Sequence, residues 1–415
     1  MTVARTVLDS GVTIVTEKVP HLRSATIGLW SEAGSRAESP RDNGIAHFIE
    51  HMLFKGTSRR KALDISREIE AVGGMMNACT EREYVFFFAK VLARDFPLAV
   101  DILSDIYLNS VFDPDELERE RGVVLQEILM VEDNPEDFVD DLFHESYWSG
   151  HPLGLPVQGT STSVGAFTRD RVTAWFGDRF RRRGLIVSVV GNMEHGRIVD
   201  TFERQMGALR LGDRRPPDAP PAPARGAFLK ERPSEQVHVC LGAPGIPRTN
   251  NRRYAARVLN TILGGSMCSR LFQEVREKRG LAYAIGSSMV LYSDSGIVKI
   301  SAGTSRDKVR ELLAVVGDVV EEMRRGAIGD EEVAMARALV RGSMILGLES
   351  AEYRMSRLAM NELLFGRIEE HDESLRQVAA VTADEVRELA GVLLRRDAFS
   401  LAAAGELPGG APLAF

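Results

Sequence analysis

The residues most able to do chemistry lie in one short stretch, His47-Phe-Ile-Glu50-His51, which is an H-x-x-E-H pattern. At about 100° per residue, an α-helix would place His51 roughly 40° from His47, and Glu50 roughly 60° to the other side. The three side chains would then share one face, with the two imidazoles one turn apart, as two ligands of a single metal ion must be. Apolar residues fall at helical spacing on the opposite face: Ile45, Phe48, Ile49, Met52 and Leu53. The sequence therefore predicts a helix that packs by one side and presents a metal-binding motif on the other.

Two imidazoles need a further partner, because a catalytic zinc usually takes three protein ligands and leaves one position for water. Glu120 and Glu127 are candidates for the third ligand. They lie seven residues apart in a segment that begins at Asp113, and on a helix they would share one face. Glu127 lies in an apolar run, where a carboxylate is costly unless a positive charge pairs with it. A bound cation would be such a partner, and a salt bridge to an arginine is the alternative; the spacing leaves both open.

A proline-rich stretch at residues 214–225 divides the chain almost equally. Such a stretch has little to bury and is typical of an extended, semi-rigid linker. We therefore predict an N-terminal catalytic, zinc-binding domain at residues 1–213 and a C-terminal homologous domain at residues 226–415 that lacks the metal motif.

The order of predicted elements repeats on the two sides of this linker. The first half has a strand at 25–32, helices at 44–54 and 63–72, a long strand pattern at 76–92, and helices at 96–108 and from 113 onward. The second half has a strand at 236–241, helices at 253–263 and 270–278, strands at 282–291 and 297–303, and helices at 308–325 and 330–348. The pattern favours an α+β fold: two homologous domains, each a mixed, mostly antiparallel sheet with helices packed on one face.

The repeat does not extend to the chemistry. If Gly56 is aligned with Gly265, the three polar positions of the H-x-x-E-H motif fall on Ala256, Leu259 and Asn260. The second half therefore keeps the scaffold without the motif, and any metal chemistry at this position belongs to the first half.

The composition narrows the class of protein. The 415 residues carry a formal charge of −7, which is unlike the strongly basic surface of nucleic-acid-binding proteins, so we expect no nucleic-acid partner. Apolar runs such as 84–89 and 185–190 are too short to cross a bilayer, and the N-terminus has no apolar signal region, so we expect no membrane partner. Three widely spaced cysteines without a C-x-x-C pattern exclude a disulfide framework and suit a reducing compartment. We therefore predict a cytoplasmic protein.

Taken together, these motifs resemble the inverted-zincin peptidases of the pitrilysin and mitochondrial-processing-peptidase group, and the short two-domain chain resembles its bacterial processing-peptidase-like branch. The resemblance spans essentially the whole chain and is carried by five segments: 47–57, 73–80, 120–128, 150–154 and 276–283. It implies a metalloendopeptidase with one zinc ion per chain, held by His47, His51 and Glu127. It also implies that Glu50 is the general base acting on the zinc-bound water, and that Glu120 supports the site from behind.

The resemblance further implies how a peptide binds. Asn77, Ala78, Cys79 and Thr80 match the family's substrate-binding edge strand, along which a peptide is added as a further strand through main-chain hydrogen bonds. Such binding requires an extended, unstructured peptide or small polypeptide. The alternative is that this segment is only a turn leading into a core strand.

Arg276 and Tyr283 match a signature of the family's C-terminal domains. The resemblance implies that Arg276 positions a substrate carbonyl and that Tyr283 hydrogen-bonds the tetrahedral intermediate. In two-domain members these residues are expected to come from the partner chain, so we predict a homodimer. Without the resemblance, they would be interpreted as a surface cation and a buried tyrosine.

Two other functions compete with peptide hydrolysis. The family includes scaffold-like members, so a non-catalytic subunit of a processing-peptidase-like assembly is one alternative, although every predicted ligand and the base are present here. The other is a small-molecule hydrolase or lyase that uses the same H-x-x-E-H helix. Those chains are much shorter, and no duplicated half is expected of them.

Overall fold

The computed structural model of the chain describes residues 2–181, 184–212 and 219–415. These residues form two compact units that interleave along the sequence. The first unit comprises Met1–Leu129, Leu155–Asp218 and Gly347–Ile368, and the second comprises Met130–Gly154, Ala219–Leu346 and Glu369–Phe415. Each unit thus includes one segment from the opposite half of the chain, which the continuous ranges predicted from the sequence did not include. The predicted linker at 214–225 lies partly outside the described residues.

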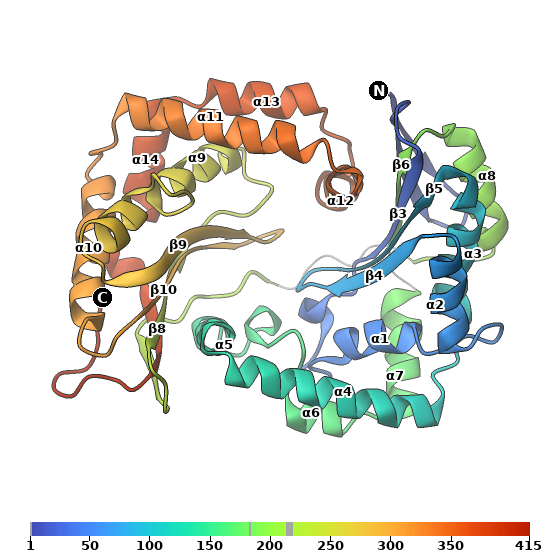
Figure 1. Ribbon diagram of the computed structural model, residues 1–415, viewed down its shortest axis with the longest axis horizontal. Coiled ribbons are helices and arrows are strands. Elements are labelled where there is room, and N and C mark those ends of the chain that lie inside the picture. Colours follow the sequence, from blue (N-terminus) through green and yellow to red (C-terminus); the bar gives the residue numbers. More distant parts are fainter. Residues whose placement is uncertain (1, 182–183, 213–218) are drawn as a thin grey trace. The chain divides into compact units, whose positions relative to one another are not determined.

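The sheet of the first unit has six strands in the order β1-β2-β6-β3-β5-β4 (Figure 1). Its strands are β1 (Thr2–Val7), β2 (Thr13–Lys18), β3 (Ser24–Ser31), β4 (Met75–Thr80), β5 (Val85–Leu92) and β6 (Leu185–Gly191). Only β2 and β6 run parallel, and the other neighbours are antiparallel. The strand pattern predicted at 76–92 is therefore a hairpin, β4 and β5, and β4 lies at the edge of the sheet.

One face of this sheet is covered by helices from the first half of the chain. They are α1 (Ile45–Leu53), α2 (Ala62–Ala71), α3 (Phe96–Asn109), α4 (Pro114–Asp133), α6 (Ser161–Gly165), α7 (Arg169–Trp175) and α8 (His195–Met206). Their buried apolar side chains and those of the strands form one continuous core, which includes Ile27, Phe48, Ile49, Phe87 and Leu103. The apolar face of α1 thus packs as its spacing predicts, because burying that stripe is the main source of helix stability.

The other face of the same sheet is covered by a helix from the second half, α12 (Ala351–Phe365), which packs on β6, β3 and β2 (Figure 1). Met355 lies in the apolar cluster between α12 and the sheet, where it accepts a 3.4 Å hydrogen bond from the Trp30 indole. Arg354 forms a buried ion pair with Glu17 of β2. A buried pair of this kind is costly to break, so α12 is an integral part of the first unit.

The second unit repeats this arrangement around a five-stranded sheet in the order β7-β11-β8-β10-β9. Its strands are β7 (Ala227–Glu231), β8 (Val237–Pro244), β9 (Ala282–Leu291), β10 (Gly296–Thr304) and β11 (Ser400–Gly405), and only β7 and β11 run parallel. Its helices are α9 (Arg253–Leu263), α10 (Val309–Arg324), α11 (Asp330–Gly347), α13 (His371–Ala380) and α14 (Ala383–Leu393), with a π-helical turn at Phe272–Glu277. These observations confirm the α+β prediction of two mixed, mostly antiparallel sheets.

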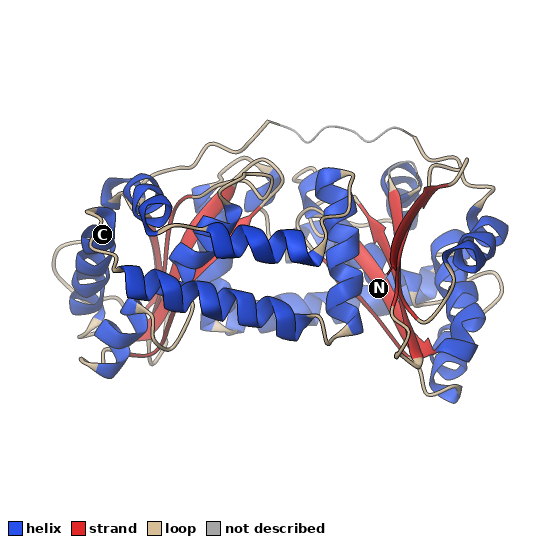
Figure 2. Cartoon of the chain, turned by 90° about the horizontal axis from the view of Figure 1, so that it is seen from above, coloured by secondary structure: helices blue, strands red, loops and turns tan. Residues whose placement is uncertain are grey.

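A helix from the first half, α5 (Pro135–Tyr147), covers the other face of this second sheet. The ring of Phe143 lies directly over Gly242 of β8, where an added Cβ would meet the ring at 2.1 Å. Lys299 of β10 forms an ion pair with Asp140 of α5. In each unit, therefore, helices lie on both faces of the sheet (Figure 2), and one of them comes from the opposite half of the chain.

The element order confirms the predicted repeat. The series β3-α1-α2-β4-β5-α3-α4-α5 in the first half corresponds to β8-α9-(272–277)-β9-β10-α10-α11-α12 in the second. The last helices of these series are α5 and α12. Each of them packs on the sheet formed by the other half of the chain. Among the described residues, no helix is both long enough and apolar enough to span a bilayer.

Candidate active site

The site begins with α1, whose N-terminus is held by a buried carboxylate. Glu38 is only 3% exposed, and its two oxygens accept hydrogen bonds from the main-chain N–H groups of Gly44 and Ala46, each at 2.9 Å. A helix leaves such N–H groups without intrahelical partners, so Glu38 satisfies them inside the protein. Gly44 itself has φ +88°, and a Cβ there would lie 2.6 Å from the Cα of Gly159. This position therefore requires glycine.

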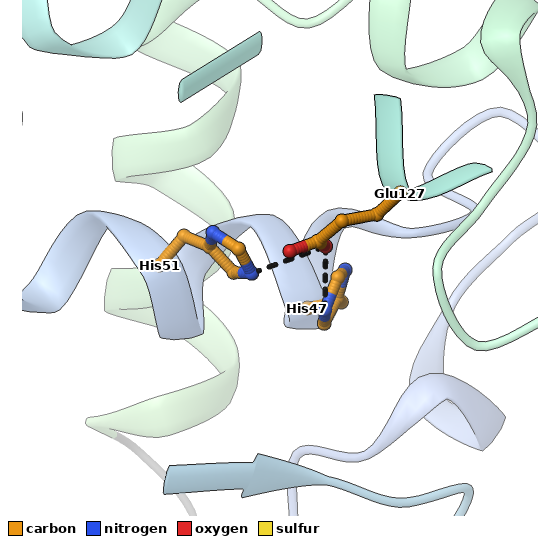
Figure 3. A group of neighbouring side chains, drawn as sticks. All are labelled: His47, His51 and Glu127. Atoms are coloured by element: carbon orange, nitrogen blue, oxygen red, sulfur yellow. Dashed lines mark ion pairs between the residues drawn. The ribbon is translucent and has the colours of Figure 1, made fainter. Parts of the chain in front are cut away.

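The polar face of α1 brings both motif histidines to Glu127 of α4 (Figure 3). The Nε2 atoms of His47 and His51 lie 3.7 Å and 3.5 Å from the same oxygen of Glu127, Oε2. All three ligand atoms lie within 4.8 Å of one another, and the side chains are half-buried. Two imidazole nitrogens and one carboxylate oxygen are a ligand set that zinc takes in catalytic sites, so the residues present fit that metal.

The second ring nitrogen of His51 has a partner of its own. Its Nδ1 lies 3.0 Å from Oε2 of Glu120, and the other oxygen of Glu120 accepts a 2.5 Å hydrogen bond from the Lys55 ammonium. Burial works to raise the pKa of Glu120, but these two partners outweigh it and hold that pKa below its usual value. An ionised Glu120 fixes the ring of His51 so that Nε2 faces Glu127, which is the arrangement that supporting carboxylates give to metal-binding histidines.

The pKa values of the two histidines are shifted in opposite directions. Burial, with a smaller contribution from neighbouring His51, lowers the pKa of His47 to about 4, so this imidazole is neutral near pH 7 and able to bind a metal. Burial also works to lower the pKa of His51. The hydrogen bond with Glu120 and the charges of Glu127 and Glu50 outweigh it and raise that pKa.

Glu50 lies on the same face of α1 and contacts the edge strand. Its Oε2 accepts a 2.5 Å hydrogen bond from the hydroxyl of Thr80 at the end of β4. Burial raises the pKa of Glu50, although the Thr80 hydrogen bonds and the charge of His51 oppose the shift. A carboxylate with a raised pKa is a better proton acceptor at neutral pH, as a general base requires.

Comparison with known proteins adds an independent line of evidence. A family model described as Insulinase (Peptidase family M16) matches residues 13–161, and one described as Peptidase M16 inactive domain matches residues 166–340. An uncharacterized zinc protease of Streptomyces coelicolor is 43% identical over 410 residues, which cover 96% of this chain and 89% of the relative. The chain belongs to peptidase family M16. An uncharacterized zinc protease of Bacillus subtilis, YmxG, is 37% identical over 395 residues, with 95% and 96% of the two chains covered. These relatives support a zinc-dependent protease.

Solved structures share the fold of this M16 chain. A structure described as a peptidase M16 inactive domain from Pseudomonas fluorescens has a TM-score of 0.93 at 21% identity, with 100% of both chains covered. A protease from Helicobacter pylori has a TM-score of 0.90 at 18% identity, with 97% of this chain and 99% of that chain covered. The predicted resemblance to this family is confirmed.

The predicted substrate strand of this M16 chain lies at a sheet edge. Asn77, Ala78, Cys79 and Thr80 all belong to β4, which among the described strands pairs only with β5. The N–H of Ala78 is hydrogen-bonded to the side-chain oxygen of Asn77, at 2.8 Å, rather than to β5. The alternative of a simple turn is therefore wrong, and main-chain groups of β4 face outward.

Arg276 and Tyr283 form a group of their own in the second unit. The guanidinium of Arg276 lies between the rings of Phe272 and Tyr283, 4.7 Å and 4.8 Å from their centroids. Tyr283 is 80% exposed, so it is not the buried tyrosine of the alternative interpretation. Both residues line a pocket of about 610 Å³ in this unit.

Glu38, like Lys55, has a role near the site that the sequence pattern did not indicate, and the role of Glu38 can be measured. We expect Glu38→Ala to lower the free energy of unfolding by about 2 kcal/mol, because two buried main-chain N–H groups lose their acceptor. Asp113 offers a matched control, since its exposed carboxylate accepts from the N–H groups of Asp115 and Glu116 at the start of α4. Asp113→Ala should cost less, about 1 kcal/mol, because water replaces the lost acceptor. Urea unfolding of the metal-free protein measures both, and equal losses would contradict this role for Glu38.

Proposed function

We propose that this M16 chain is a zinc metalloendopeptidase that hydrolyses peptide bonds in unstructured peptides or small polypeptides. The observation that carries the proposal is the convergence of Nε2 of His47, Nε2 of His51 and Oε2 of Glu127 beside the carboxylate of Glu50. One zinc ion per chain would be held by these three side chains, with Glu120 orienting the ring of His51.

When bound there, zinc supplies a Lewis acid that lowers the pKa of a water molecule and polarises the scissile carbonyl. Glu50 accepts the proton of the attacking water on its carboxylate and then donates that proton to the nitrogen of the leaving amine. Glu50 is adjacent to His51 and about one turn from His47 on α1, so its carboxylate lies beside the predicted ligands. It is not one of the three side chains whose ligand atoms converge. Thr80 and the buried face of α1 keep it there.

The substrate is proposed to bind as an added strand along β4. The outward-facing main-chain groups of β4 recognise an extended backbone and are indifferent to most side chains. This mode admits peptides of many sequences but excludes segments that are already folded. We expect Asn77, Ala78, Cys79 and Thr80 to provide this edge.

Arg276 and Tyr283 are proposed to complete the site from the partner chain of a homodimer. Tyr283 presents an exposed hydroxyl, and the neighbouring guanidinium of Arg276 is held between two rings. Donors of this kind stabilise the negative charge that develops on a carbonyl oxygen during hydrolysis. Since one chain carries both groups of residues, two copies would contain two complete sites.

Metal removal tests the proposed function. The purified protein should contain about one zinc per chain, cleave a quenched-fluorescent unstructured peptide, lose that activity with a chelator and regain it when zinc is restored. Replacing a ligand, as in His47→Ala, should remove most of the zinc. His21→Ala, at an exposed histidine outside the site, should change neither metal content nor activity. Metal-free protein without peptidase activity would contradict the proposal and favour the scaffold alternative.

A further inference from the structure

Thr80 hydrogen-bonds the carboxylate of Glu50. Its hydroxyl donates to Oε2 of that carboxylate at 2.5 Å. Thr80 is the last residue of β4, so the strand proposed to bind substrate ends at the proposed base. Nothing in the sequence pattern indicated this contact, which joins residues thirty positions apart.

The alternation of β4 shows which of its donors face outward. In an antiparallel ladder, every second residue directs its main-chain N–H away from the neighbouring strand. The N–H of Glu81 donates to the carbonyl of Tyr84 across the hairpin, and the N–H of Ala78 donates to the side chain of Asn77, so by alternation the N–H groups of Ala78 and Thr80 point away from β5. A peptide strand can use the N–H of Ala78 once the Asn77 side chain moves aside.

We propose that Thr80 is a positioning residue, whose hydroxyl holds the carboxylate of Glu50 in one orientation at the end of the strand proposed to bind the substrate. This inference rests on the proposed peptidase function. The terminal torsion of a glutamate side chain is broad and poorly restricted by itself. A hydroxyl donor on a fixed strand restricts that freedom, so the carboxylate is oriented before the substrate arrives.

Two substitutions separate this role from a substrate contact. Thr80→Val keeps the shape and the main-chain N–H but removes the hydroxyl, and Thr80→Ser keeps the hydroxyl. With zinc-loaded protein and a quenched-fluorescent peptide, Thr80→Val should lower kcat about ten- to a hundredfold, with KM and zinc content unchanged within about twofold. Thr80→Ser should retain at least about half of kcat. A rise in KM at unchanged kcat would instead assign Thr80 to substrate binding and overturn the inference.

A second measurement needs neither metal nor activity. In metal-free protein, Thr80→Val should shift the urea midpoint of unfolding downward, and the shift should largely disappear in a Glu50→Ala background, because the two side chains stabilise the fold through each other. Thr201→Val, which removes a hydroxyl that donates to a main-chain carbonyl on α8, should give the same shift in both backgrounds. Additive shifts for Thr80 and Glu50 would contradict the inference. If the wild-type protein cleaves no peptide, the proposed function fails; if it does and Thr80→Val matches it, only the role of Thr80 fails.

Discussion

Glu50→Gln is expected to lower kcat about a thousandfold while the protein keeps about one zinc per chain. Glutamine has the shape of glutamate and can still accept the hydrogen bond from the Thr80 hydroxyl, so the local geometry should persist. It cannot take a proton from the attacking water, and this step is the one that Glu50 is proposed to perform. The three predicted ligands are unchanged by the substitution.

The experiment measures metal content by elemental analysis and turnover of a quenched-fluorescent peptide at saturating concentration. Glu118→Gln is a matched control, because Glu118 is an exposed glutamate of α4 that pairs with Arg121 away from the predicted ligands. It should retain wild-type activity. Substantial turnover by Glu50→Gln would refute the base assignment, and loss of zinc would place Glu50 among the ligands instead.

Mixing two inactive variants is expected to restore activity. His51→Ala removes a predicted ligand, and Tyr283→Phe removes a donor whose loss in comparable sites lowers kcat about a hundred- to a thousandfold. In a heterodimer of the two, the zinc site of the Tyr283→Phe chain would meet the intact Tyr283 of its partner. Random exchange makes about half of the dimers mixed, with one intact site of two in each, so about a quarter of the wild-type activity should return.

The control for this experiment is each variant mixed with itself under the same exchange conditions, which should restore nothing. A mixture of His51→Ala with Glu50→Gln gives a sharper control, because both changes affect α1 and every site in every dimer stays defective if the zinc group and Glu50 come from one chain. Complete absence of recovery in the first mixture would mean that Tyr283 acts within its own chain.

The motif helix could be predicted from the sequence because its information is local. The apolar stripe of α1 and the polar face with His47, Glu50 and His51 follow from one period of 3.6 residues, and the structure has both. The pairing of His51 with Glu120 and the approach of Glu127 depend instead on how α4 packs against α1. Periodicity left both carboxylates open as ligands, and the resemblance to a family distinguished them.

Glu38 shows why other parts of the site could not be predicted. Acidic residues are favoured before a helix, but Asp42 lies nearer to the start of α1 and fits that preference better. In the structure Asp42 pairs with Arg171, at 2.7 Å, and Glu38 takes the helix N–H groups. The choice depends on a residue more than a hundred positions away, which no local pattern contains. The packing of α5 and α12 on the sheet of the opposite half of the chain is hidden from the sequence for the same reason.

The reciprocal placement of α5 and α12 limits how the gene can be divided. A truncated product that stops near residue 213 would fold without α12, and the apolar row over Trp30 and Ile186 would then face water. A fragment that contains only the C-terminal half would lack α5. The residues that α5 covers, such as Gly242 and Ile297, would then be exposed to water. We therefore expect that neither fragment folds stably by itself. A protein divided at this point should require coexpression of both fragments.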